Sequence, residues 1–88
     1  MNILYDKRFF KDIEAINDKR LKQQIETVIS EIENAEQLHL LHNLKKMKGH
    51  KYAYRIRIGN YRLGFFYENH AVICTRLLNR KDIYKYFP

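Results

Sequence analysis

The chain has 88 residues, of which 45% are hydrophobic and 31% charged, with a formal net charge of +7. These values predict one folded domain over 1–88 with a single core, and they exclude a disordered or linker-rich chain. The only cysteine, Cys74, excludes an internal disulfide and fits a reducing cytoplasm as a small buried side chain. No signal peptide and no apolar stretch near 18 residues is present, so we expect a cytoplasmic protein without a membrane span.

The first part of the chain predicts a strand and two helices. NILY (2–5) suits a short strand, and Asp6 suits the N-cap of a helix over 7–16, where apolar residues recur at helical spacing. Asp18 is placed to cap a second helix. Its apolar stripe is formed by Leu21, Ile25, Val28, Ile29 and Ile32. Because the turn between them is short, the helices are expected to form an antiparallel hairpin with this stripe on a sheet.

Three strand signals follow a segment that fits either a short helical turn or an apolar loop. The strands are predicted at 52–58, 61–67 and 71–78, and Gly59-Asn60 and Asn69-His70 are two-residue turns of the hairpin type. The tail over 80–88 fits a short helix or an extended segment. The fold class is therefore α+β, with an N-terminal strand and a two-helix antiparallel hairpin packed on an antiparallel β-sheet.

The run KYAYRIRIGNYRLGFFY (51–67) holds the strongest pattern in the chain. Its first strand alternates, and the apolar set expected to meet the helices is Tyr52, Tyr54, Ile56 and Ile58. Arg55 and Arg57 then point to the opposite, open face of the sheet. The next strand is apolar on both sides, so alternation leaves its facing open, and the register across the turn would bring Arg62 near Arg57.

The charge is divided unevenly along the chain. Residues 1–36 hold six basic and eight acidic side chains, a net charge of −2, whereas residues 37–88 hold eleven basic and two acidic ones, a net charge of +9. No carboxylate lies between Gln37 and Tyr67. Like charges that face each other on a sheet repel by several tenths of a kcal/mol or more. The division predicts a scaffold joined to a part that faces a polyanion.

Further basic and aromatic residues flank the arginine strand. They are Lys45, Lys46, Lys48 and Lys51 before it, and Arg76, Arg80, Lys81, Tyr84, Lys85 and Tyr86 after it. Basic groups interleaved with aromatic rings favour RNA over a small acidic metabolite, because the rings can stack on bases. The alternative is a solvated cationic surface that only keeps the protein soluble.

Other constellations are weak. The four histidines lack a cysteine or acidic partner at ligand spacing, so we expect no metal site, and no glycine-rich phosphate loop or other cofactor signature is present. His50 stands among the lysines, where it is either an exposed loop residue or an acid or base near a phosphate. Asp6, Asp12 and Glu14 are interpreted as capping and surface charges, and Glu68 as a surface charge.

The runs LKKMKGHKYAYRIRIGNYRLGFFY (44–67) and RLLNRKDIYKYFP (76–88) resemble the RelE/ParE superfamily of bacterial toxins from type II toxin–antitoxin systems. With the helical hairpin before them, the resemblance covers the whole chain, and it implies a sheet that carries two N-terminal helices. In the RelE-like branch it implies a ribosome-dependent endoribonuclease that cleaves mRNA and leaves a 2′,3′-cyclic phosphate. The implied partners are the ribosome, mRNA and a cognate antitoxin with an acidic or amphipathic segment.

The same resemblance implies roles for individual residues. The predicted catalytic set is Arg55, Arg57, Arg62, Arg80 and Tyr84. Within it, Arg62 and Arg80 are assigned to the charge of the transition state, and Tyr84 to stacking or proton transfer. The predicted substrate-binding set is Lys45, Lys46, Lys48, His50, Lys51, Arg76 and Lys81.

One position departs from the family pattern. Close relatives often have histidine just before RKDIY, whereas this chain has Asn79. A guanidinium barely titrates, so proton transfer would fall to His50 or Tyr84. The departure keeps a second interpretation open, a ParE-like toxin that shares the fold, lacks nuclease chemistry and inhibits DNA gyrase. A plain basic RNA-binding module is a third.

Overall fold

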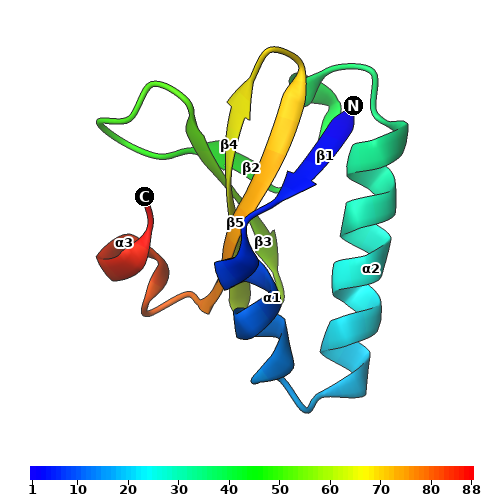
Figure 1. Cartoon of the computed structure of the whole chain (residues 1–88), viewed down its shortest axis with the longest axis vertical. Coiled ribbons are helices and arrows are strands. Elements are labelled where there is room, and N and C mark those ends of the chain that lie inside the picture. Colours follow the sequence, from blue (N-terminus) through cyan, green and yellow to red (C-terminus); the bar gives the residue numbers. More distant parts are fainter.

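The computed structural model describes residues 1–88 as helices packed around a five-stranded sheet (Figure 1). The elements in chain order are β1 (Asn2–Tyr5), α1 (Lys7–Glu14), α2 (Lys19–Asn34), a 3₁₀ helix (Leu38–Leu40), β2 (Leu44–Lys46), β3 (Ala53–Ile58), β4 (Tyr61–Glu68), β5 (Ala71–Asn79) and α3 (Ile83–Tyr86). None of these helices has both the length and the apolar character that a membrane crossing needs. The α+β class is confirmed.

The two predicted helix caps are confirmed. The Asp6 carboxylate accepts a hydrogen bond from the Arg8 N–H at 2.8 Å, and Asp18 accepts from the Arg20 and Leu21 N–H groups at 2.9 and 3.2 Å. These bonds satisfy backbone donors that a helix start leaves unpaired. The chain descends in α1 and returns in α2 (Figure 1), with the buried part of the α2 stripe facing the sheet.

The sheet differs from the prediction at one edge. Its strand order is β1-β5-β4-β3-β2, and β1 runs parallel to β5, with Asn2 opposite Ala71, while all other neighbours are antiparallel. A wholly antiparallel sheet was therefore wrong, and the sheet is mixed. The reason is that the whole chain from α1 to β4 separates β1 from β5, so no hairpin turn constrains their direction. The ambiguous segment before β3 supplies the 3₁₀ helix and the short edge strand β2.

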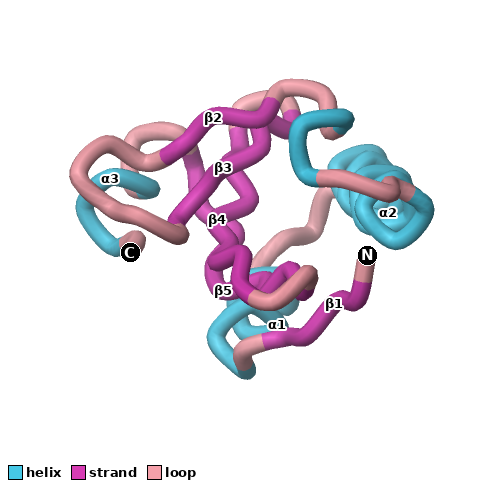
Figure 2. Tube along the Cα trace, turned by 90° about the horizontal axis from the view of Figure 1, so that it is seen from above, coloured by secondary structure: helices cyan, strands magenta, loops and turns pink.

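The two faces of the sheet carry different cores. α2 lies on one side and α3 on the other (Figure 2). The main core, on the α2 side, includes Ile56 from β3 and Leu63 and Phe65 from β4, which settles the facing of β4. The prediction was wrong for Tyr52, which is 45% exposed because β3 begins one residue later.

The opposite face is only partly open, which corrects the expectation of an open arginine face. A second small core lies on it, formed by Met47, Ala53, Ile83 and Phe87, with Phe66 and Leu78 packed against it. Ile83 of α3, Phe87 directly after it and Met47 of the loop between β2 and β3 are three of these six residues, and none of the three was assigned a buried role from the sequence. The arginines of β3 therefore border a packed helix and not bare solvent.

β5 keeps its apolar side chains on the core face by means of a bulge. Cys74 pairs with Phe65 and Arg76 pairs with Gly64, so Thr75 is an extra residue between them. The Thr75 hydroxyl donates to the Ile73 carbonyl at 2.9 Å. A bulge shifts the alternation by one residue, which puts Arg76 on the face of Gly64 and Leu77 with the core.

The reactivity of Cys74 can be used to test whether the main core is closed, because this thiol is buried in it. The side chain is fully buried, and desolvation raises the pKa of its thiol from 9.0 to about 12. The unfolded chain therefore loses this proton first, and the free energy of unfolding falls as pH rises above 9 by roughly 1.4 kcal/mol per pH unit until the folded pKa is reached. At pH 8 we expect Ellman's reagent to react at least tenfold more slowly with the native protein than in urea. Equal rates would contradict the buried position.

Candidate functional site

The arginines of β3 and β4 lie side by side on the face that carries α3. Arg57 is directly opposite Arg62, and Arg55 is opposite Gly64, in the β3–β4 ladder. Partners directly opposite one another project to the same face of a sheet. The predicted approach of Arg62 to Arg57 is thus confirmed, and two like charges oppose each other across the hairpin.

Arg62 is the centre of this group. Burial lowers the pKa of its guanidinium, the charges of Arg55 and Arg57 lower it further, and Arg80 adds to them, while Tyr84 acts in the opposite direction. Each of the other four residues is therefore within electrostatic reach of Arg62, and we call the five together the arginine cluster. They are the same five residues that the family resemblance implies for catalysis. Because an arginine pKa starts so high, Arg62 remains charged at neutral pH.

Two hydrogen bonds fix the position of Arg62. Its Nη1 donates to the carbonyl of Gly59 at 3.1 Å and to the carbonyl of Tyr61 at 2.9 Å. The acceptors lie in the β3–β4 turn and at the first residue of β4, so this end of the hairpin orients one edge of the guanidinium. The remaining N–H groups make no hydrogen bond within the chain and are available to an anion.

No carboxylate neutralises the arginine cluster. The chain has two side-chain ion pairs, Arg8 with Asp6 and Arg76 with Asp12, and neither involves the cluster. Arg57 Nη2 donates to Asn43 Oδ1 at 3.4 Å, and the Nε of Arg55 is buried without a hydrogen-bond partner. Such unneutralised and partly desolvated cations form a site that attracts phosphate.

Arg76 is the exception among the predicted binding residues. Asp12 accepts from its Nε at 2.8 Å and its Nη2 at 3.1 Å, and also from the Leu77 N–H at 2.9 Å. Asp12 was interpreted as a capping or surface charge, and this was wrong. Its carboxylate accepts a hydrogen bond from a backbone N–H of β5 at a position beyond the end of β1, where no strand is present to pair with β5. The two ends of this pair are 64 residues apart, so spacing in the sequence gave no signal.

The other residues of the predicted substrate-binding set lie partly on β2 and partly on loops, and the register of β2 decides which face of the sheet its lysines share. Lys45 is opposite Arg55 in the β2–β3 ladder and shares its face, whereas Lys46 is opposite Tyr54 and projects to the other side. The remaining members lie exposed on loops: Lys48, His50 and Lys51 between β2 and β3, and Lys81 after β5. Lys51 lies over the ring of Tyr52, with Nζ 5.5 Å from the ring centroid.

α3 carries two exposed aromatic rings, of which that of Tyr84 is within electrostatic reach of Arg62. Ile83 and Phe87 are buried against the sheet, while Tyr84 and Tyr86 are 62% and 59% exposed. The side chain of Asn79, at the departure from the family pattern, accepts from the Lys81 N–H at 3.0 Å. Asn79 therefore shapes the turn into α3, and its amide does not titrate, so it offers no proton for catalysis.

Two residues that pack on the arginine face were missed from the sequence. Phe87 was treated as part of an unassigned tail, and Gly64 as one position in an apolar strand. A Cβ at Gly64 would lie 2.6 Å from Cδ2 of Phe87. The available signal was a glycine inside an aromatic strand, LGFF, because glycine there marks a close approach of another group.

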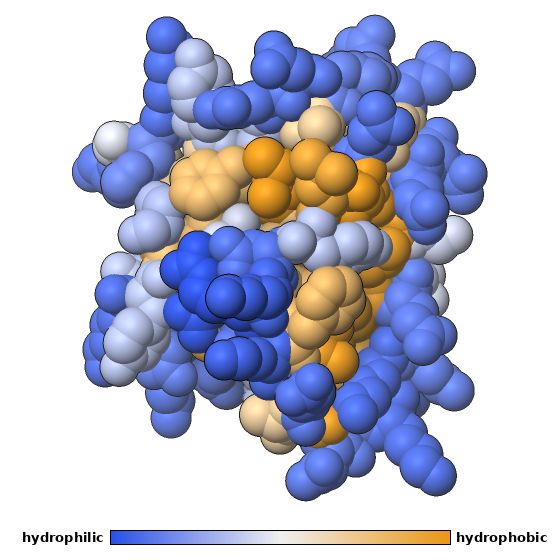
Figure 3. Space-filling view, viewed as in Figure 1, coloured by the Kyte–Doolittle hydropathy of each residue, from blue (hydrophilic) through white to orange (hydrophobic).

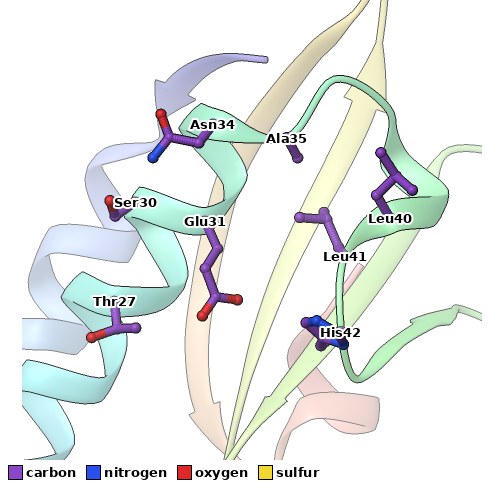
Figure 4. Close-up of a pocket in the computed structure, with 8 residues that line it drawn as sticks. All are labelled: Thr27, Ser30, Glu31, Asn34, Ala35, Leu40, Leu41 and His42. Atoms are coloured by element: carbon purple, nitrogen blue, oxygen red, sulfur yellow. The ribbon is translucent and has the colours of Figure 1, made fainter.

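Two other surface features lie apart from the arginine cluster. A hollow between the second half of α2 and residues 40–42 is lined by Glu31 and His42 among others, and by no lysine or arginine (Figure 4). Apolar residues gather in the middle of the face that carries β1 and α1 (Figure 3), where Leu4, Tyr5 and Phe10 are exposed. The hollow is unsuited to a polyanion, whereas the apolar surface is of the kind that a protein partner covers.

Comparisons with known proteins agree with this geometry. No family model matches the chain. The protein "Toxin RelE3" of Methanocaldococcus jannaschii is 39% identical over 89 residues, covering 100% of each chain. Among solved structures, a chain of the RelB–RelE antitoxin–toxin complex from Methanococcus jannaschii is similar with a TM-score of 0.81 and 39% identity, over 97% of this chain and 99% of that one.

More distant structures share the fold. The YoeB dimer from Staphylococcus aureus gives a TM-score of 0.73 at 20% identity, over 91% of this chain and 97% of that one. The intact RelBE toxin–antitoxin complex of E. coli gives 0.69 at 17% identity, over 89% and 94%. The predicted arrangement of helices on a sheet is thus one that solved toxin structures adopt.

Proposed function

As this chain belongs to the RelE family of toxins of type II toxin–antitoxin systems, we propose that it stops translation by cutting mRNA on the ribosome. The observation that carries the proposal is the arginine cluster. It holds four guanidinium groups without a carboxylate partner beside the exposed ring of Tyr84. Such a site suits a phosphodiester whose negative charge increases during reaction.

The proposed reaction is an internal transfer of the phosphoryl group. The ribose 2′-oxygen loses its proton and attacks the adjacent phosphorus, the bond from phosphorus to the 5′-oxygen breaks, and that oxygen takes up a proton. The products are a 2′,3′-cyclic phosphate and a 5′-hydroxyl end. Arg62 and Arg80 stabilise the phosphorane, with Arg55 and Arg57 adding to the positive field. Tyr84 stacks on a base or moves a proton, and His50 is the other titratable candidate.

The proposed partner is a cognate antitoxin. The structures from Methanococcus jannaschii (RelB–RelE) and E. coli (RelBE) reported above are both antitoxin–toxin complexes. An acidic or amphipathic segment of the antitoxin would cover the arginine cluster and supply the carboxylates that this chain lacks. Because ribosomes and mRNA are the proposed targets, the site of action is the cytoplasm.

Primer extension on mRNA from cells that express the chain tests this function. We expect growth arrest with cuts that follow the codon phase of translated mRNA, and no cuts in a matched transcript whose start codon is removed. Intact mRNA with an SOS response would overturn the proposal in favour of gyrase inhibition. Normal growth would favour a plain RNA-binding module.

A further inference from the structure

One close contact stands out where the end of α3 packs on the sheet. The ring of Phe87 lies on Gly64 of β4, so near that an added Cβ would be 2.6, 2.8 and 2.9 Å from three of its carbons. The same ring is 5.2 Å from the ring of Phe66, centroid to centroid. Real Cβ atoms do not approach other heavy atoms below 3.0 Å, so no other residue type at position 64 leaves this ring in place.

Gly64 lies in the middle of the arginine face. Its partner on β3 is Arg55 and its partner on β5 is Arg76, and Arg62 is two residues before it on the same face. The ring of Phe87 therefore occupies the floor of the site. Tyr84 is three residues before Phe87 in the chain, and the Phe87 N–H donates to the Ile83 carbonyl at 2.9 Å. The helical turn that carries Tyr84 is thus held at both ends, by Ile83 before it and by Phe87 after it.

We propose that Gly64 and Phe87 form a seat that positions Tyr84 over the arginine cluster. Both are positioning residues for the cleavage reaction, and the inference rests on the proposed function. Gly64 acts through Phe87 and α3, and touches no reacting atom. The main core lies on the other face of the sheet, where Leu63 and Phe65 project, so a change of the seat leaves it in place.

The test uses Gly64→Ala in the full chain and the rate at which purified protein cuts ribosome-bound mRNA. The new methyl group displaces the Phe87 ring and with it Tyr84, and a displacement near 1 Å can lower a rate by up to about 100-fold. We expect at least a tenfold loss in the maximal rate, with little change in the mRNA concentration for half-maximal rate. Phe87→Ala removes the ring, so Gly64→Ala should lower the rate little further when Phe87→Ala is already present, because no ring is left for the methyl group to displace.

A double-mutant cycle separates positioning from a general loss of structure. If the seat acts through Tyr84, Gly64→Ala lowers the rate at least tenfold in the parent chain but less than threefold when Tyr84→Ala, which removes both the ring and the hydroxyl, is already present. The same factor in both backgrounds, or full activity of Gly64→Ala, would overturn the inference. A parent chain that cuts no mRNA would instead overturn the proposed function, so the two failures are distinguishable.

Discussion

We expect Arg62→Ala to lower the proposed cutting of mRNA by at least about 100-fold, because it removes a fixed cation from the position where the proposed reaction would develop phosphorane charge. The guanidinium is held by the Gly59 and Tyr61 carbonyls, so its geometry is set before the substrate arrives. The melting temperature stays constant or rises slightly, since Arg62 repels Arg57 across the hairpin. Cutting of ribosome-bound mRNA and thermal melting of the same preparations measure both effects.

A charge-matched control distinguishes the position of Arg62 from the total charge of the protein. Lys7→Ala removes one positive charge from the exposed start of α1, away from the arginine cluster, and is expected to keep full activity. If Arg62→Ala cut mRNA as fast as Lys7→Ala, Arg62 would have no role in the reaction. If both variants lost activity equally, total charge and not the position of Arg62 would be responsible.

The largest expected effect on stability comes from Asp12→Ala. The side chains of Arg76 and Asp12 are only 20% and 13% exposed. Removing the carboxylate leaves a mostly buried guanidinium and the Leu77 N–H without their acceptor. Breaking a buried pair in this way costs about 3 kcal/mol or more. In a domain of this size that lowers the melting temperature by more than about 10 °C.

Glu14→Ala is the matched control for Asp12. Glu14 lies on the same short helix and is exposed, and its side chain makes no hydrogen bond or ion pair. We expect its melting temperature to stay within a few degrees of the parent chain. An Asp12→Ala variant that melted together with Glu14→Ala would show that the pair with Arg76 contributes nothing to stability.

The parts of the fold that could be predicted are those set by neighbouring residues. Asp18 starts α2 because its carboxylate reaches N–H groups two and three residues ahead. Asn69 and His70 both have positive φ, at 51° and 63°, which is the geometry of the predicted two-residue hairpin turn. Each of these features depends on a few consecutive residues, so the sequence pattern contains it in full.

The features that could not be predicted depend on distant contacts. The parallel pairing of β1, the Asp12–Arg76 pair and the packing of Phe87 on Gly64 join segments from different parts of the chain. The bulge at Thr75 also interrupts the alternation of apolar and polar residues along β5, because Thr75 is an extra residue without a partner on β4. For the candidate site, by contrast, alternation predicted the facing of Arg55 and Arg57, and the short turn after β3 predicted the approach of Arg62 to Arg57.

The most direct test of the account compares two ribosome-bound mRNAs that differ in a single oxygen atom. Purified protein is added to ribosomes programmed with an all-ribose mRNA, or with one that carries a 2′-deoxy nucleotide at the cut site. If the chain is the proposed nuclease, the first is cut to a 2′,3′-cyclic phosphate end and the second stays intact, because its nucleophile is absent. Cutting of the 2′-deoxy mRNA at an equal rate, or of neither mRNA, would contradict the account.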